Sequence, residues 1–210
     1  MEHVHRLQTA IEALVIGASA GGIDAVERLL AALPARCRLA VFVVLHLPAG
    51  RPSRLAQIFS GRCALPVVEP LDKQPVVPGT VYVAPPDYHM LVEPDRTVAL
   101  SIDAPILYSR PAIDPLFESA AVAYGPALLA VVLTGASADG SAGLRAVRRA
   151  GGTAWIQDPA SALARTMPDA ALAAAGADAV LSIDEIAQRL EQMATVPLVP
   201  TDAPPTLQRE

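Results

Sequence analysis

The sequence predicts an α/β protein: a doubly wound three-layer sandwich with a mostly parallel sheet and an inserted antiparallel β-hairpin. Short runs of continuous apolar residues, typical of strands buried on both faces, alternate with segments of helical spacing. The chain has 210 residues, a length that suits one domain. Apolar residues make up 52% of it and aromatic residues 4%, so small aliphatic side chains must fill the interior. Such a composition favours two helical layers packed on a sheet.

The first elements form a strand–helix–strand unit. Residues 13–17 are an apolar run that ends at a glycine, and residues 23–33 carry apolar side chains at helical spacing until Pro34 ends the helix. Residues 39–45 form a second apolar run, which ends at His46. This order implies two parallel strands joined by a right-handed crossover.

The rest of the chain continues the alternation. We expect a short helix at 52–59, a hairpin region built from 80–84, 89–92 and 97–102, and a helix at 113–124. Further strands are expected at 128–133, 153–157 and 179–182, and further helices from the glycine-rich turn 135–143 to about 149, at 167–175 and at 184–193. We expect residues 1–11 to form a leader, 12–194 one domain, and 195–210, with four prolines, a disordered tail.

Composition excludes several functions. The net charge is −5 and no basic stripe exists, which argues against a nucleic-acid partner. No apolar run approaches the roughly 20 residues that a membrane-spanning helix needs, and no signal peptide precedes the first strand, so we expect a cytoplasmic protein without membrane insertion. Cys37 and Cys63 fit neither a disulfide framework nor a metal motif. We therefore expect free thiols and no metal.

Polar side chains follow the buried strands, where open α/β sheets bind their ligands. Ser19 follows the first strand and His46 the second, while Asp139 and Asp158 follow two later strands. One edge of the sheet thus offers a hydroxyl, an imidazole and a carboxylate. These are the parts of a Ser–His–Asp hydrolase, whose chain order differs between unrelated folds.

The turn around Ser19 allows two interpretations. Glycines at 17, 21 and 22 permit a sharp strand-to-helix turn, which would expose a nucleophilic hydroxyl next to free amides at a helix N-terminus. The same pattern also suits a phosphate-cradling turn, and the residues of the turn favour neither. A dinucleotide site usually has an acidic residue at the end of the second strand, but this chain has His46 there and no carboxylate until Glu69.

The proposed base and acid also have plainer alternatives. His46 could be a core histidine, and the rival base His89 falls in the inserted hairpin. Asp139 could be an ordinary turn aspartate before a glycine. It follows a fully apolar strand, however, which places its carboxylate where it could be buried against an imidazole. The competing carboxylates are Asp24, Asp114 and Asp158.

Seven segments in order resemble the catalytic domain of the CheB-type protein-glutamate methylesterase family of chemotaxis. They are IGASAGG at 16–22, LHLP at 45–48, VYVAP at 81–85 before His89, RPAIDPLF at 110–117, LTGASADG at 133–140, QD at 157–158 and MP at 167–168. The resemblance covers about residues 14–190, nearly the whole predicted domain. The ordered set favours the hydrolase over the phosphate-binding turn.

The resemblance implies an esterase that removes methyl groups from glutamyl methyl esters on the cytoplasmic helices of methyl-accepting chemoreceptors. Family members also deamidate particular receptor glutamines. By motif match, Ser19 is similar to the family nucleophile, His46 to its general base and Asp139 to its orienting acid. No cofactor or metal is implied.

Further site residues follow from the same match. The backbone amides of Ala20, Gly21 and Ala136 are candidates for the oxyanion hole. Arg110 and Met167 are candidates for substrate binding, although Arg110 could equally be an ordinary surface arginine before a proline.

The chain departs from the family pattern in several places. Ala136 and Ser137 stand where the family usually has Met-Gly, Ala20 stands where it has Thr, and Thr166 replaces a glycine. A serine at a position of positive φ would strain the loop, and loss of the Met side chain would widen the substrate groove.

Well-known family members carry a regulatory receiver domain ahead of the catalytic domain, and the resemblance does not include that domain. The residues before the first strand are too few for a receiver domain, which suggests control by a separate regulatory protein or none. Two alternatives to the methylesterase stay open. One is a catalytically weak module that binds chemoreceptors or signalling kinases, and the other is a serine esterase for a different methyl ester or amide.

Overall fold

A parallel sheet forms the centre of the protein. The computed structural model describes residues 10–47, 50 and 52–195, and within them the sheet has seven strands in the order β3-β4-β2-β1-β7-β8-β9. The strands are β1 (Ala13–Ala18), β2 (Ala40–Leu45), β3 (Val67–Val68), β4 (Val81–Val83), β7 (Leu128–Val132), β8 (Thr153–Gln157) and β9 (Ala179–Leu181). A separate antiparallel hairpin pairs β5 (His89–Val92) with β6 (Val98–Ser101). The predicted fold class is confirmed.

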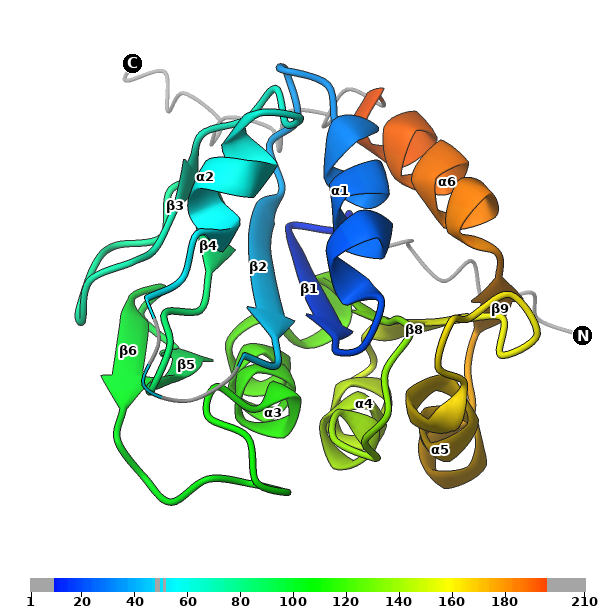
Figure 1. The fold of residues 1–210 in the computed structure, drawn as a ribbon. Coiled ribbons are helices and arrows are strands. Elements are labelled where there is room, and N and C mark those ends of the chain that lie inside the picture. Colours follow the sequence, from blue (N-terminus) through cyan, green and yellow to red (C-terminus); the bar gives the residue numbers. More distant parts are fainter. Residues whose placement is uncertain (1–9, 48–49, 51, 196–210) are drawn as a thin grey trace, which may run out of the picture.

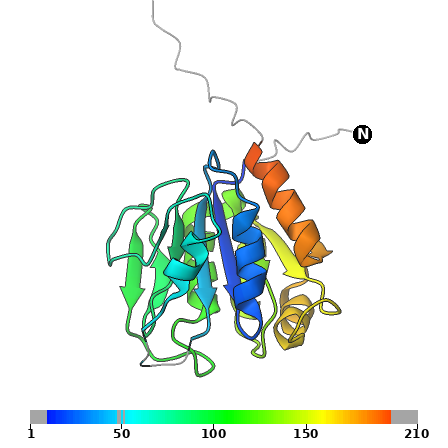
Figure 2. The same cartoon turned by 45° about the horizontal axis from the view of Figure 1, so that its top comes forward.

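Helices cover both faces of the sheet (Figures 1 and 2). On one face lie α1 (Gly22–Ala31), α2 (Leu55–Ser60) and α6 (Ile183–Thr195); on the other lie α3 (Ile113–Tyr124), the short 3₁₀ turn η1 (Gly125–Ala127), α4 (Ser141–Arg149) and α5 (Thr166–Ala175). Successive side chains of a strand point to opposite faces, so the central strand feeds two apolar cores. Leu14 and Ile16 pack with α1 and α6, whereas Ala13 and Val15 pack with α3 and α4.

The sheet is built outward from its central strand β1, first toward β2 and β4 and later in the sequence toward β7, β8 and β9. Strand β1 pairs with β2 on one side and with β7 on the other, both in parallel. All strands of this sheet are parallel and therefore end at the same edge, which for β1 and β2 is the lower edge in Figure 1. Loops after β1, β2 and β7 meet there, which is where open parallel sheets place their ligands.

The hairpin region differs from the expectation. Residues 80–84 were expected within the hairpin, but Val81–Val83 is a fully buried strand of the main sheet, parallel to β2 and β3. Only β5 and β6 form the hairpin, which packs its Met90 and Val98 into the core beside α3. The predicted helix at 113–124 and the predicted strand at 153–157 have the observed bounds, and most other elements agree within about two residues.

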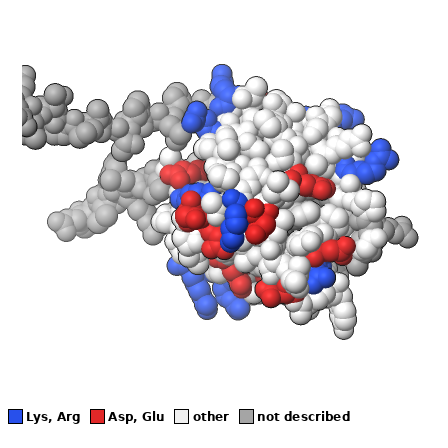
Figure 3. Space-filling model, turned by 90° about the vertical axis from the view of Figure 1, so that its left-hand side faces the viewer, with Lys and Arg blue, Asp and Glu red and all other residues white. Residues whose placement is uncertain are grey.

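Several other expectations concern the surface and the termini. The predicted leader, beyond residues 10 and 11, and the predicted tail beyond residue 195 lie outside the described residues. Cys37 and Cys63 are free cysteines. None of the described helices combines the length and the apolarity that crossing a membrane requires. On the face shown in Figure 3, acidic and basic side chains are intermixed.

We expect Gly143→Ala to destabilise the protein although alanine favours helices. A Cβ at Gly143 would lie 2.5 Å from Cβ of Phe117 and 3.1 Å from the backbone oxygen of Asp114, so α3 and α4 would have to separate. Overpacking of this kind costs about 1–3 kcal/mol. Urea denaturation measures the loss. The matched control is Gly61→Ala, because Gly61 has helical backbone angles and its added Cβ would meet only a carbonyl oxygen at 3.3 Å. Equal stability of both variants would contradict the close packing of these helices.

Candidate active site

Ser19 lies in the sharp turn between β1 and α1. Its amide donates to the carbonyl of Thr134 at 2.9 Å, and its carbonyl accepts from the amide of Gly22 at 2.8 Å. Gly21 has φ of +77°, which glycine adopts without steric cost. A Cβ at Gly22 would lie 2.7 Å from Cβ of Ala18, so both glycines are needed for the turn. The Ser19 side chain is thereby held half-buried at the edge of the sheet.

His46 is placed beside Ser19 by strand register. The β1–β2 ladder pairs Ala18 with Leu45, so Ser19 and His46 are the first residues beyond a matched pair. The amide of His46 donates to the carbonyl of Ala18 at 3.2 Å, which continues the pairing past the strand ends. The His46 side chain is 10% exposed. Protein therefore covers most of the imidazole.

Asp139 is fully buried beneath His46. Its Oδ2 accepts from Nε2 of His46 at 2.7 Å and from the amide of Ile113 at 2.6 Å. Its Oδ1 accepts from the amides of Asp114 at 3.0 Å and Gly140 at 2.9 Å. Ile113 and Asp114 begin α3, and Gly140 caps α4. The carboxylate thus lies at two helix N-termini, where negative charge is stabilised.

The environment of Asp139 keeps it ionised. Burial would raise the pKa of its carboxyl, but hydrogen bonds from His46 and from the amides of Ile113 and Asp114 outweigh burial and lower the pKa. An ionised Asp139 needs a proton on Nε2 of His46. The other ring nitrogen, Nδ1, is then left as a hydrogen-bond acceptor.

The Ser19 hydroxyl makes no hydrogen bond among the described residues. A nucleophile and its general base would share a hydrogen bond, but none joins Ser19 and His46 in this conformation, although register places the two residues side by side. Contacts between catalytic groups are often loose without substrate. The hydroxyl is left available for a reaction partner.

Two of the three candidate oxyanion-hole amides, those of Ala20 and Gly21, lie in the turn that carries Ser19. The third, that of Ala136, lies in the loop after β7. Within the described residues, the N–H groups of Ala20, Gly21 and Ala136 have no acceptor, and all three residues are exposed. The neighbouring Ser137 has an ordinary negative φ, so the strain considered for it is absent. Its hydroxyl instead accepts from the amide of Asp139 at 3.2 Å. The loop keeps unpaired donors despite its departures from the family pattern.

The two side chains predicted to bind substrate, Met167 and Arg110, have different environments in the structure. Met167 is fully buried, and a Cβ at Gly135 would lie 2.6 Å from its Cε, so Met167 supports the loop after β7 from beneath. The role of Met167 in substrate binding stays a prediction. Arg110 donates through Nη1 to the carbonyls of Ile102 at 2.8 Å and Asp103 at 3.0 Å, and its Nη2 makes no hydrogen bond in the described part of the chain.

The rival residues have structural roles. Nδ1 of His89 accepts from the amide of Ala112 at 3.2 Å, and its Nε2 contacts the carbonyl of Ala104 at 3.1 Å. His89 is 2% exposed and therefore fixes the segment before α3 rather than facing Ser19. The Asp114 carboxylate accepts from the amide of Gly143 at 2.7 Å and so caps α4.

Sequence reasoning missed the connecting role of Thr134. Its hydroxyl donates to the carbonyl of Ala20 at 2.9 Å and accepts from the amide of Ala164 at 2.9 Å. Its amide donates to Oε1 of the buried Gln157 at 2.8 Å. A threonine directly after an apolar strand was the available signal, but its partners come from distant loops.

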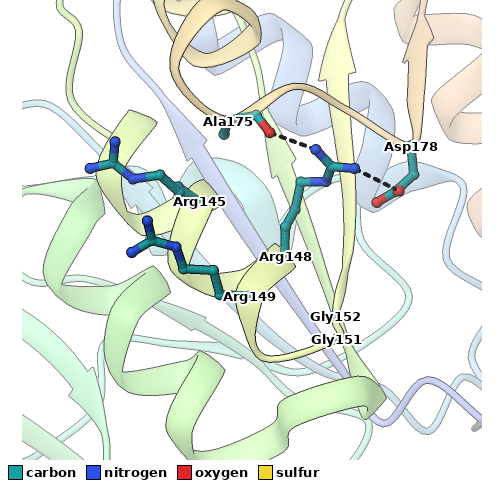
Figure 4. A pocket seen from close by; sticks show the side chains of 7 residues that line it. All are labelled: Arg145, Arg148, Arg149, Gly151, Gly152, Ala175 and Asp178. Atoms are coloured by element: carbon teal, nitrogen blue, oxygen red, sulfur yellow. Dashed lines mark hydrogen bonds and ion pairs between the residues drawn. The ribbon is translucent and has the colours of Figure 1, made fainter.

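A hollow of about 440 Å³ lies elsewhere, at the C-terminal end of α4 (Figure 4). Arg148 donates there to the carbonyl of Ala175 at 2.6 Å and pairs with Asp178 at 3.4 Å, while Arg145 and Arg149 extend to the other side. Asp139 and its partners lie at the opposite end of α4. The hollow is thus separate from the candidate site.

We expect Asp114 to make stability depend on pH. Burial, together with the charges of Asp139 and Glu118, raises the pKa of Asp114 to about 6, so the folded state holds this proton more tightly than the unfolded chain. The free energy of unfolding should therefore fall as pH rises from about 4 to 6. Asp114→Asn keeps an acceptor for the Gly143 amide and should flatten this part of the profile, which urea denaturation at several pH values measures. An unchanged slope in the variant would contradict the raised pKa.

Comparisons with known proteins identify the family of this chain. The sequence pattern of the CheB methylesterase family matches residues 14–190. A Caulobacter vibrioides protein-glutamate methylesterase/protein-glutamine glutaminase is 39% identical over 180 residues, which are 84% of this chain and 52% of that relative. A Leptospira interrogans protein, to which the same name is assigned provisionally, is 41% identical over 184 residues. These residues are 86% of this chain and 95% of the Leptospira protein.

A solved structure agrees as well. The crystal structure of the Thermotoga maritima CheB methylesterase catalytic domain matches with a TM-score of 0.82 at 31% identity, covering 88% of this chain and 99% of that domain. The chain therefore spans about half the length of the Caulobacter relative but nearly all of this catalytic domain. With this fold, this strand-edge arrangement and these matches, the chain belongs to the CheB methylesterase family.

Proposed function

We propose that the protein is a serine hydrolase that demethylates glutamyl methyl esters on chemoreceptor cytoplasmic helices. The observation that carries the proposal is the buried hydrogen bond between Asp139 and His46, 2.7 Å long, at the strand edge where Ser19 follows β1. A fixed imidazole with one free nitrogen beside an unbonded hydroxyl is the arrangement that activates a serine.

Acylation begins when Ser19 attacks the ester carbonyl. Nδ1 of His46 takes the hydroxyl proton, and Asp139 stabilises the resulting imidazolium. The carbonyl oxygen becomes an oxyanion, for which the free amides of Ala20, Gly21 and Ala136 are the candidate donors. When the tetrahedral intermediate collapses, the C–O bond to the methoxy group breaks and His46 returns the proton, so methanol leaves and Ser19 carries the glutamyl group.

Deacylation repeats these steps with water as the nucleophile. His46 takes a proton from water, the hydroxide attacks the glutamyl ester, and Ser19 leaves with the proton that His46 returns. The product is a glutamate carboxylate. A glutamine amide would follow the same path and release ammonia, in agreement with the double name of the Caulobacter relative.

Family membership supports the choice of substrate. We propose methyl-accepting receptor helices in the cytoplasm as the substrate. Arg110 remains our candidate for contact with an acidic receptor surface, since its Nη2 is unbonded in the described chain. It lies three residues before Ile113, whose amide binds Asp139.

We expect Ser19→Ala to abolish demethylation without unfolding the protein. Loss of the nucleophile should lower kcat by about 10⁴-fold or more. Release of methanol from membranes that carry methylated receptors measures it, and thermal unfolding checks the fold. Unchanged methanol release would contradict the assignment of Ser19. No release by the unmodified protein would instead favour a receptor-binding module or an esterase with another substrate.

We expect Asp139→Asn to lose both activity and stability. The amide nitrogen cannot accept hydrogen bonds, so one pair of donors around the side chain loses its partner, which costs about 1–3 kcal/mol. The imidazole also loses the charge that fixes its proton on Nε2, and kcat should fall about 10⁴-fold. Steady-state kinetics and urea denaturation measure the two effects. A variant with full activity would show that Asp139 has only a structural role.

A further inference from the structure

The Thr134 hydroxyl lies where three loops of the active-site edge meet. It donates to the carbonyl of Ala20, in the nucleophile turn, at 2.9 Å. It accepts from the amide of Ala164, in the loop before α5, at 2.9 Å. Thr134 itself starts the loop that follows β7, and its side chain is 2% exposed. One hydroxyl thus joins the turn that carries Ser19 to two other segments.

This hydrogen bond determines the direction of a neighbouring amide. The peptide between Ala20 and Gly21 is trans and planar, so its N–H points opposite to its C=O. Because the Ala20 carbonyl points at Thr134, the Gly21 N–H points away from it. That N–H has no acceptor among the described residues. It is therefore held in one direction and left free for a ligand.

The turn needs such an external constraint because of its own sequence. Gly21 and Gly22 are adjacent, and glycine restricts the backbone least of all residues. Leu163, next to Ala164, lies against Gly21, since a Cβ there would be 2.7 Å from its Cδ2. The loop before α5 thus supports the turn through this side chain and through the Thr134 hydroxyl.

The position of Thr134 is itself fixed. Its amide donates to Oε1 of Gln157 at 2.8 Å, and its carbonyl accepts from the amide of Ser19 at 2.9 Å. Gln157 ends β8 and is 2% exposed. Thr134 is therefore held at both of its backbone groups, by Gln157 at the end of β8 and by Ser19 directly after β1.

We infer that Thr134 is a positioning residue of the reaction: its hydroxyl holds the Ala20–Gly21 peptide so that the Gly21 N–H faces the oxyanion that forms when Ser19 attacks. The inference rests on the proposed function. An oriented donor stabilises developing charge, so the effect belongs to the transition state and not to substrate binding.

The test compares Thr134→Val, which removes the hydroxyl at similar volume, with Thr134→Ser, which retains it. Ser161→Ala is the matched control, because its hydroxyl binds the Asp158 carbonyl in the same loop without touching the nucleophile turn. Methanol release gives kcat and KM. A fluorophosphonate gives a second rate: Ser19 Oγ bonds to phosphorus, fluoride leaves, and His46 takes the hydroxyl proton while the phosphonyl oxygen occupies the oxyanion position.

We expect Thr134→Val to lower kcat and the rate of phosphonylation on the order of 10²-fold with KM unchanged. Thr134→Ser should stay within about threefold of the unmodified protein, and Ser161→Ala should match it. Should Thr134→Val fail to fold, Thr134→Ala takes its place in the comparison with Thr134→Ser. Full kcat without the hydroxyl, an equal loss in the serine variant, or a change confined to KM would overturn the inference.

The two readouts separate this inference from the proposed function. If the unmodified protein is phosphonylated at Ser19 but releases no methanol, the methylesterase proposal fails, and the phosphonylation rates alone decide the role of Thr134. If it neither releases methanol nor reacts at Ser19, the inference is overturned too, because the turn then carries no nucleophile.

Discussion

The burial of one carboxylate organises this protein. Leaving an ionised Asp139 in the interior without partners would be prohibitive, and four N–H groups compensate for its lost water. Supplying them requires α3 and α4 to begin at the same place. Gly140, with φ of +91° and with Ile113 2.9 Å from where a Cβ would stand, meets that requirement. The close approach of the two helices at Gly143 follows from the same convergence.

The rigid interior of the sheet and the reactive groups at its edge occupy different parts of the molecule. Both faces of β1 are fully buried and apolar, which leaves its position little freedom. The neighbouring strands β2 and β7 are likewise apolar, and the first polar side chains beyond these three strands are Ser19, His46 and Thr134. Unpaired amides occur in the same short stretch of backbone. The reacting groups are thus attached directly to the least deformable part of the molecule, which favours an arrangement that needs little reorganisation during reaction.

The sequence predicted the parts of this structure that depend on local patterns. The spacing of apolar residues and the positions of glycine and proline were sufficient to predict the helix at 113–124. They were also sufficient to place Ser19, His46 and Asp139 at one edge of the sheet. Val81–Val83 was predicted in the hairpin, but it pairs with β2 in the main sheet. A short apolar run does not show which strand it pairs with, because that pairing depends on residues distant in the sequence. The contacts of Thr134 could not be predicted for the same reason, since they are made with Ala20 and Ala164, which are distant in the sequence.

The central position of β1 also bears on how the protein acquires activity. His46 reaches the site from one half of the sheet, while Thr134 and Asp139 reach it from the other half, through β7. Neither half contains all of the groups, and they meet only through contacts between distant parts of the chain, which form late and slowly in parallel sheets. A partly folded chain with the first strand–helix–strand unit in place would expose its serine and histidine without the carboxylate that organises them. Newly synthesised protein would then stay inert until its C-terminal half has docked, so catalytic competence and the completed native state would arrive together.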